Sequence, residues 1–220
     1  MFRLIPLLAE PEIAELRAIA AAHQFVDGRI TNPHSTVKNN LQLHDGPAQA
    51  RTAEIVRAAI LANDDFRHSV YPKAIAPAML SRYDVGMNYG LHADTALMQL
   101  PRGLIRADVS CTVFLSDPDS YDGGALRVTL GSGTLTFKEP AGTAIVYPST
   151  TLHEVEPVTR GARLVALTFI QSFVSDPLKR DMLYELHEVA ALEGLKMEFA
   201  NYTRLQAVLS NLLRRWSDGP

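Results

Sequence analysis

The central part of this chain, from about residue 75 to 174, is a succession of short extended runs separated by Gly, Pro and Asp. Runs rich in β-branched and aromatic residues, bounded by such turn formers, are typical of strands. The runs cover residues 79–84, 89–94, 109–116, 125–130, 134–137, 143–147, 152–155 and 163–173. Because no long helix separates them, they predict an antiparallel double-sheet jelly roll, also called a double-stranded β-helix.

Helical patterns flank this region on its N-terminal side. Residues 11–23 and about 47–62 place apolar side chains three or four positions apart, and Pro11 suits a first helical turn. Between them, 28–31 and 37–42 resemble short strands or ordered loops. We expect these N-terminal elements to pack on the barrel.

Helical patterns return after the barrel. Ser175-Asp176-Pro177 predicts the start of one helix, and an apolar stripe from Phe199 to Trp216 predicts another. The chain should therefore be mainly β with flanking helices (α+β). Its predicted parts are an N-terminal helical and strand region (1–74), a jelly-roll core (75–174) and a C-terminal helical extension (175–220). The apolar stripe fits packing on the barrel or on a second subunit, as in a homo-oligomer.

The core carries a candidate metal site. His92 and Asp94 are two residues apart in an extended run, so their side chains should point to the same face. A second histidine, His153, lies in a later run. Two imidazoles and one carboxylate form the ligand set that holds Fe(II) in non-haem oxygenases while leaving coordination positions open.

A cation accompanies this set. Arg163 follows His153 by ten residues, and the turn-rich segment 156–161 separates them. A hairpin centred near Val158 would place the two residues opposite each other on one interior face. A 2-oxo acid can fill two metal positions and leave one for dioxygen, while Arg163 binds the far carboxylate of 2-oxoglutarate. The residues thus predict a dioxygenase that converts 2-oxoglutarate to succinate and hydroxylates a substrate.

The residues around these positions carry a family resemblance. The order of His92, Asp94, His153 and Arg163 resembles that of the iron and 2-oxoglutarate dioxygenases. The flanking residues resemble the bacterial PKHD-type hydroxylases, which are relatives of prolyl hydroxylases. The matching stretches are 27–29, 37–40, 82–83, 89–94, 115–124, 147–149, 158–161 and 212–216, so the resemblance spans nearly the whole chain.

The resemblance implies Fe(II) bound by the His-Asp-His set, Arg163 as the 2-oxoglutarate ligand, and L-ascorbate as an accessory reductant. It also implies a link to iron uptake, but it supplies no substrate. Related prolyl hydroxylases have a tyrosine that reaches the co-substrate, and Tyr83 is the corresponding candidate, with a packed core tyrosine as the alternative. Phe114 departs from relatives that have a tyrosine there, so Thr112 is the candidate for the missing hydroxyl.

Substrate contacts are expected on loops, since loops on a rigid scaffold usually carry recognition. The segments 28–42 and 95–106 are the expected substrate lids. Asn39, Asn40 and Arg106 are the candidate contacts within them.

Two other functions are consistent with parts of the pattern. A cupin-like module that binds iron, or senses iron or oxygen without catalysis, would need the metal ligands but not a fixed cation such as Arg163. A nucleic-acid demethylase of the same superfamily would resemble its relatives in a second arginine six residues after the first, where this chain has Phe169. The formal charge of −3 also gives no reason to expect nucleic acid as a partner.

The remaining composition limits the setting. Cys111 is the only cysteine, which excludes an internal disulfide and a thiolate zinc site. No stretch is long and apolar enough to cross a bilayer, and the N-terminus has no convincing cleavage site. These features predict a cytoplasmic protein whose partners are dioxygen and a substrate.

Overall fold

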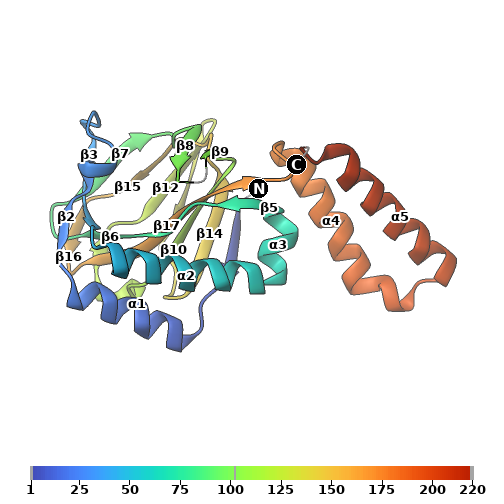
Figure 1. The fold of residues 1–220 in the computed structure, drawn as a ribbon, viewed down its shortest axis with the longest axis horizontal. Coiled ribbons are helices and arrows are strands. Elements are labelled where there is room, and N and C mark those ends of the chain that lie inside the picture. The colour runs from blue at the N-terminus through green and yellow to red at the C-terminus, as the bar shows by residue number, and fades with distance from the viewer. Residues whose placement is uncertain (1, 102, 219–220) are drawn as a thin grey trace.

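Three layers form the body of the protein in the computed structural model, which describes residues 2–101 and 103–218. Helices α1 (Glu10–Ala22) and α2 (Gly46–Ala62) cover one face of a large sheet, as Figure 1 shows. A smaller sheet lies on the opposite side of the large sheet. The two sheets confirm the predicted jelly-roll-like α+β fold.

The large sheet is antiparallel and has the strand order β1-β14-β10-β17-β6-β4-β2, with β5 also paired to β17. These strands are β1 (Arg3–Pro6), β2 (Phe25–Asp27), β4 (Leu41–Leu43), β5 (Pro72–Ile75), β6 (Met79–Tyr83), β10 (Val109–Phe114), β14 (Thr143–Pro148) and β17 (Arg163–Ser172).

The small sheet has the order β13-β12-β15-β7-β3. Its strands are β3 (Lys38–Asn39), β7 (Asn88–His92), β12 (Leu126–Leu130), β13 (Gly133–Phe137) and β15 (His153–Val155). Two ribbons complete the strands: β8 (Leu97–Leu100) with β9 (Gly103–Arg106), and β11 (Asp122–Gly123) with β16 (Val158–Arg160). All eight runs predicted in the core form strands.

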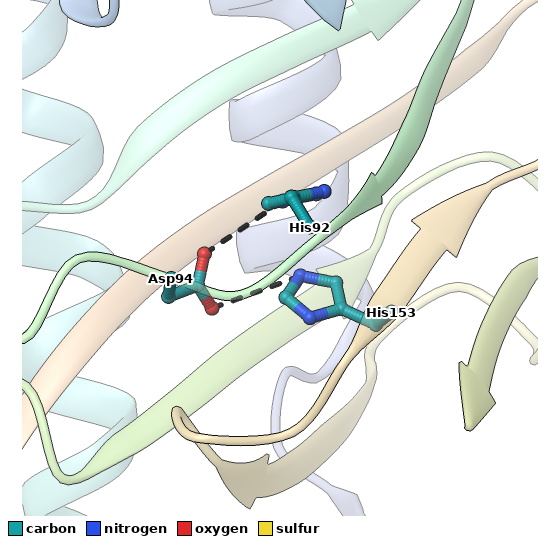
Figure 2. A group of neighbouring side chains, drawn as sticks. All are labelled: His92, Asp94 and His153. Atoms are coloured by element: carbon teal, nitrogen blue, oxygen red, sulfur yellow. Dashed lines mark ion pairs between the residues drawn. The ribbon is translucent and has the colours of Figure 1, made fainter. Parts of the chain in front are cut away.

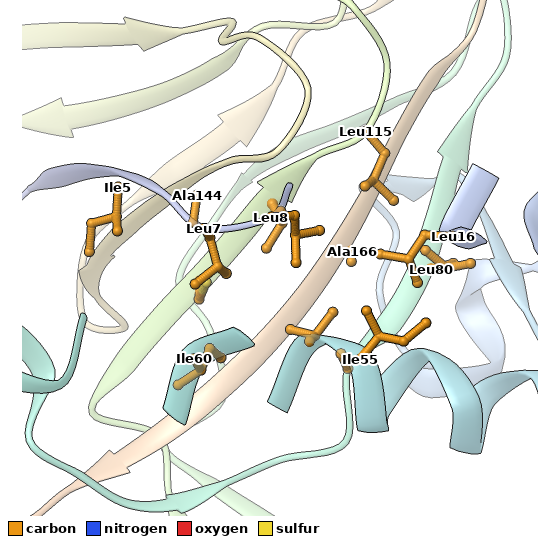
Figure 3. Close-up of a cluster of buried hydrophobic side chains, with 14 of the residues drawn as sticks. Ile5, Leu7, Leu8, Leu16, Ile55, Ile60, Leu80, Leu115, Ala144 and Ala166 are labelled. Atoms are coloured by element: carbon orange, nitrogen blue, oxygen red, sulfur yellow. The ribbon is translucent and has the colours of Figure 1, made fainter. Parts of the chain in front are cut away.

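Alternation along the central strands separates a core face from a site face. On β10, Val109, Cys111 and Val113 belong to the main hydrophobic cluster between the large sheet and the helices. Ser110 and Thr112 point to the other face, because neighbouring side chains of a strand alternate. Figure 3 shows part of this cluster, in which Leu16 and Ile55 of the helices meet Leu80 and Ala166 of the sheet. The helices thus stabilise the sheet from behind and leave its front for the site.

The predicted helices are present, with additions. Helix α4 (Pro177–Glu193) begins at Asp176, whose carboxylate accepts hydrogen bonds from two backbone amides of the first turn. Helix α5 (Phe199–Trp216) packs against α4, and the pair projects away from the sheets in Figure 1. The structure also has α3 (Asp64–Val70) and the 3-10 helices η1 (Gly28–Thr31), η2 (Pro118–Ser120) and η3 (Gly194–Lys196). No helix among the described residues is long and apolar enough to cross a membrane.

The predicted hairpin around Val158 is wrong. Strand β15 pairs with β12 and β7 in the small sheet, whereas β17 pairs with β10, β6 and β5 in the large sheet. Between them the chain forms β16, which pairs with β11. Gly161 then turns the chain with φ +69°, packed so closely on Ser120 that a β-carbon would clash. The turn residues therefore carry the chain from one sheet to the other.

Candidate metal centre

The three predicted metal ligands lie together at one end of two neighbouring strands. His92 ends β7 and His153 begins β15, and the strand register places them directly opposite each other. Asp94 lies two residues beyond β7, outside the extended run in which it was predicted. The ligand atoms of the three side chains all lie within 4.8 Å of one another. Figure 2 shows both imidazoles directed toward the carboxylate.

Hydrogen bonds fix which nitrogen of each imidazole faces the centre. The Nδ1 of His92 lies 2.8 Å from the carbonyl of Gly90, and the Nδ1 of His153 lies 2.9 Å from that of Thr151. A carbonyl can only accept, so each Nδ1 carries the proton and donates it. Each Nε2 then keeps a free lone pair toward Asp94. Burial, followed by the neighbouring His153, lowers the pKa of His92, which favours the neutral imidazole that binds metals.

The carboxylate is also held in place. Ser110 on β10 donates its hydroxyl to Oδ2 of Asp94 at 2.5 Å, and its own oxygen lies 2.8 Å from the hydroxyl of Ser149. The large sheet therefore orients a ligand that the small sheet carries. Two neutral imidazoles and one fixed carboxylate, all largely buried, fit a divalent first-row metal in a three-sided site with further positions open.

The hydroxyl of Ser110 should be needed for full metal affinity. We expect Ser110→Ala to weaken Fe(II) binding about 10- to 100-fold, the usual cost of losing a group that orients a metal ligand. Anaerobic Fe(II) titration measures this loss. Ser69→Ala is the control, because it removes another buried hydroxyl, one that donates to the carbonyl of Phe66 in α3. Equal iron affinity in Ser110→Ala and the wild type would contradict this role.

A local irregularity in β7 places an aromatic ring on one ligand. The register shifts between His153 and Val155, which pair with His92 and Tyr89 respectively. The extra residue in β7 lets Tyr89 and His92 share a face, as in a β-bulge. Their rings stack with centroids 3.7 Å apart and planes 12° from parallel. Tyr89 therefore restricts rotation of the His92 imidazole from outside the metal position.

A cavity of about 510 Å³ opens between the sheets around these ligands. This volume suits a small co-substrate and part of a substrate. Its lining includes the metal ligands together with three further predicted residues, Arg163, Tyr83 and Thr112. Arg163 and Thr112 come from the large sheet, so Arg163 lines the same cavity as His153 although the predicted strand pairing is wrong.

Arg163 is a buried cation. The residue is only 1% exposed, yet no carboxylate of the described residues lies within ion-pair distance of it. Its guanidinium carbon lies 5.0 Å from the centre of the Tyr83 ring and 5.7 Å from that of Phe114. Among the described residues its Nε has no hydrogen-bond partner. An isolated buried charge is costly, so this cation is arranged to receive an anion from the cavity.

Neutral hydroxyls surround the same part of the cavity. Burial raises the pKa of Tyr83, although the neighbouring Arg163 and Asn40 act in the opposite direction. Burial also raises the pKa of Tyr147, against the opposite influence of the neighbouring Thr112. Both tyrosines thus remain uncharged donors at neutral pH.

Of the residues predicted to contact the substrate, some line the cavity and others do not. Asn40 is buried and lines the cavity, whereas Asn39 is exposed and its side-chain amide donates to the carbonyl of Gly86. The guanidinium of Arg106 is bound by the carboxylates of Asp108 and Asp218, away from the cavity lining. The segment 95–106, predicted as a loop, forms the ribbon β8–β9, and its first strand contributes to the lining.

Sequence reasoning missed several cavity residues. Tyr89, Tyr147 and Lys38 line the cavity but are singled out by the sequence only as members of matching stretches, and Ser110 is not singled out at all. Ser149, which contacts Ser110 outside the cavity lining, also lies in a matching stretch. The alternation of β10 carries a signal for Ser110, since a hydroxyl at a buried strand position needs a partner. Nothing in the sequence pairs that hydroxyl with Asp94.

Known proteins resemble this chain along its length. Residues 78–171 match the model of the 2OG-Fe(II) oxygenase superfamily. A PKHD-type hydroxylase from Sphingopyxis alaskensis is 60% identical over 98% of this chain and 99% of that protein. One from Thermosynechococcus vestitus is 44% identical over 96% of each chain.

Solved structures share the fold. A prolyl-4-hydroxylase from Pseudomonas putida has a TM-score of 0.54 and 20% identity, covering 78% of this chain and 92% of that chain. HygX from Streptomyces hygroscopicus, with nickel and 2-oxoglutarate bound, has a TM-score of 0.53 and 17% identity, covering 79% of this chain and 84% of that chain.

Proposed function

The chain belongs to the PKHD-type hydroxylases of the 2OG-Fe(II) oxygenase superfamily, and from this premise we propose the roles of its cavity residues. His92, Asp94 and His153 hold Fe(II), and Arg163 binds the distal carboxylate of 2-oxoglutarate. The observation that carries the proposal is the buried, unpaired guanidinium of Arg163 in the cavity that also contains the ligand cluster. Such a cation needs an anion, and a planar guanidinium binds a carboxylate through two hydrogen bonds.

Different residues of the cavity would have different roles in an oxygenase. Bound iron supplies the redox chemistry that couples dioxygen to decarboxylation of 2-oxoglutarate and hydroxylation of the substrate. The two imidazoles and Asp94 would hold Fe(II), and Arg163 would fix the orientation of 2-oxoglutarate in the same cavity. Tyr83 and Thr112 provide uncharged hydroxyls beside it. The apolar walls formed by Leu126, Val155 and Val165 exclude water from the reacting groups.

Arg163 also distinguishes this proposal from a cupin-like iron-binding or sensing module. A site that only stores or senses iron gains nothing from a buried cation across the cavity from its ligands. A nucleic-acid demethylase is disfavoured because Phe169 stands where such enzymes resemble one another in a second arginine.

Co-substrate binding tests the proposal directly. We expect the Fe(II) protein to develop a visible charge-transfer band when 2-oxoglutarate is added without oxygen. We also expect slow succinate formation in air without added substrate, lost when Zn(II) replaces Fe(II), since Zn(II) has no redox chemistry. Absorption spectra and succinate assays measure the two results. A protein that binds iron but shows no band would instead fit the cupin-like module.

We also propose the wider setting that the family resemblance implies. L-ascorbate serves as an accessory reductant that keeps the iron reduced, and the protein works in the cytoplasm in connection with iron uptake. Residues 75–174 form the catalytic core, while 1–74 and 175–220 support it. Exposed apolar side chains on the C-terminal helices, including Leu178, Met182 and Phe199, support association into a homo-oligomer.

A further inference from the structure

A second buried cation lies in the outer part of the cavity. Lys38 is on β3, at the edge of the small sheet, and its side chain lines the cavity although the residue is only 8% exposed. Its ammonium lies 5.6 Å from the centre of the Tyr89 ring, and that ring stacks on His92. Lys38 is thus separated from the metal ligands by one aromatic ring.

The ammonium is positioned by a polar chain rather than by an acid. It donates to the hydroxyl of Thr31 at 2.7 Å, and that hydroxyl donates in turn to the side-chain oxygen of Gln42 at 2.9 Å. An ammonium has three N–H donors. Within the described part of the chain, Thr31 is the one hydrogen-bond acceptor of Lys38, so two donors remain for a ligand.

Among residues 2–101 and 103–218, no carboxylate forms an ion pair with Lys38. Its nearest acidic influences are Asp27 and Asp94, and neither lies within 4 Å of the ammonium. Asp27 is already paired with Arg29, and Asp94 belongs to the metal cluster. Burial lowers the pKa of Lys38 to about 8, so most of it is still charged at neutral pH.

Lys38 and Arg163 serve different parts of the cavity. Arg163 begins β17, a central strand of the large sheet, and lies near the rings of Tyr83 and Phe114. Lys38 lies on the edge strand of the small sheet, beside Thr31 and Gln42. One cation suffices for the distal carboxylate of 2-oxoglutarate, and its other carboxylate belongs at the metal. The second cation is therefore left for the molecule that is hydroxylated.

We propose that Lys38 binds a carboxylate of the primary substrate, which makes the substrate class an organic acid. The inference rests on the proposed function, because it takes Arg163 and the metal cluster as the co-substrate site. Leu97 and Met98 of β8 add apolar surface to the same cavity. The bound acid would place its carboxylate at Lys38 and its carbon chain toward the metal.

Simple acids can test this site without knowledge of the substrate. The protein is loaded with Zn(II) and saturated with 2-oxoglutarate, and calorimetry then measures binding of acetate, butanoate and hexanoate and of their neutral amides. We expect the acids to bind more tightly than the amides. Lys38→Met should weaken acid binding about 30-fold or more, as expected when one partner of a buried charge pair is removed. Lys38→Arg should retain part of it.

Controls separate this proposal from its alternatives. Lys196→Met removes an exposed lysine, paired with Glu193, and should leave acid binding unchanged. Lys38→Gln, which keeps a polar side chain, replaces Lys38→Met if the latter does not fold. Equal acid affinity in the Lys38 variants and the wild type would overturn the proposal, as would the absence of any preference for acids over amides. Lys38 variants that lose 2-oxoglutarate instead would assign Lys38 to the co-substrate.

The two proposals fail in different ways. Failure of the wild-type Zn(II) protein to bind 2-oxoglutarate would remove the proposed function itself. Normal 2-oxoglutarate binding without discrimination between acids and amides would remove only the role of Lys38.

Discussion

Replacing His153 with alanine is expected to abolish detectable turnover and to weaken Fe(II) binding by more than about 100-fold, beyond the loss typical of residues that only support a metal ligand. His153 supplies one of three ligands, and its Nδ1 hydrogen bond to Thr151 directs the other nitrogen at the centre. The truncated site would keep only His92 and Asp94. Anaerobic Fe(II) titration and succinate formation measure the two effects.

His34→Ala provides the matched control, because His34 is exposed and lies outside the cavity lining. Its iron affinity and turnover should equal those of the wild type. Stoichiometric, undiminished iron binding by His153→Ala would mean that the metal binds elsewhere.

Replacing Arg163 with alanine should separate the co-substrate from the metal. We expect 2-oxoglutarate binding to weaken by about 2 to 5 kcal/mol, because one partner of a buried charge pair is lost, while Fe(II) affinity stays nearly unchanged. Arg163→Lys should recover only part of this loss, since an ammonium cannot reproduce the paired donors of a guanidinium. Separate titrations with Fe(II) and with 2-oxoglutarate measure both affinities.

Arg160→Ala is the control for Arg163. Arg160 is an exposed cation three residues away on β16, paired with Asp122 on β11, the other strand of the same ribbon. Its removal should affect neither ligand. If Arg163→Ala instead weakened iron binding and spared 2-oxoglutarate, Arg163 would be a structural residue and the co-substrate would bind elsewhere.

Local patterns were sufficient to predict the strands and to single out three residues that cluster in the fold. Alternation and turn residues are short-range signals, so each run in the core could be recognised from its own sequence. The side chains of His92, Asp94 and His153 are metal-binding types, so their identity alone indicates a possible metal site. Asp94 nevertheless acts from a loop, because β7 ends at His92.

Contacts between residues that are distant in the sequence could not be predicted from local patterns. The spacing of His153 and Arg163 is compatible with a hairpin, yet the two residues lie on opposite sheets. Between them the chain pairs with β11 and then turns at Gly161. The partners of Ser110 and Lys38 are separated from them by at least seven residues in the chain and become neighbours only after the strands pack. Burial, which makes Lys38 and Arg163 unusual, is a property of the fold and not of either residue.

Residues of the proposed metal and co-substrate site come from both sheets, so ligand binding should affect the stability of the folded protein. The proposed metal ligands His92 and His153 are on strands of the small sheet, and Asp94 follows one of these strands. From the large sheet, Ser110 donates to Asp94 and Arg163 lines the same cavity. A metal and a co-substrate bound together would contact residues of both sheets across the cavity. Separating the sheets would then require their release. Ligands that bind only the native state stabilise it by mass action. We therefore expect the enzyme with both ligands bound to resist separation of the two sheets more strongly than the enzyme that lacks either ligand.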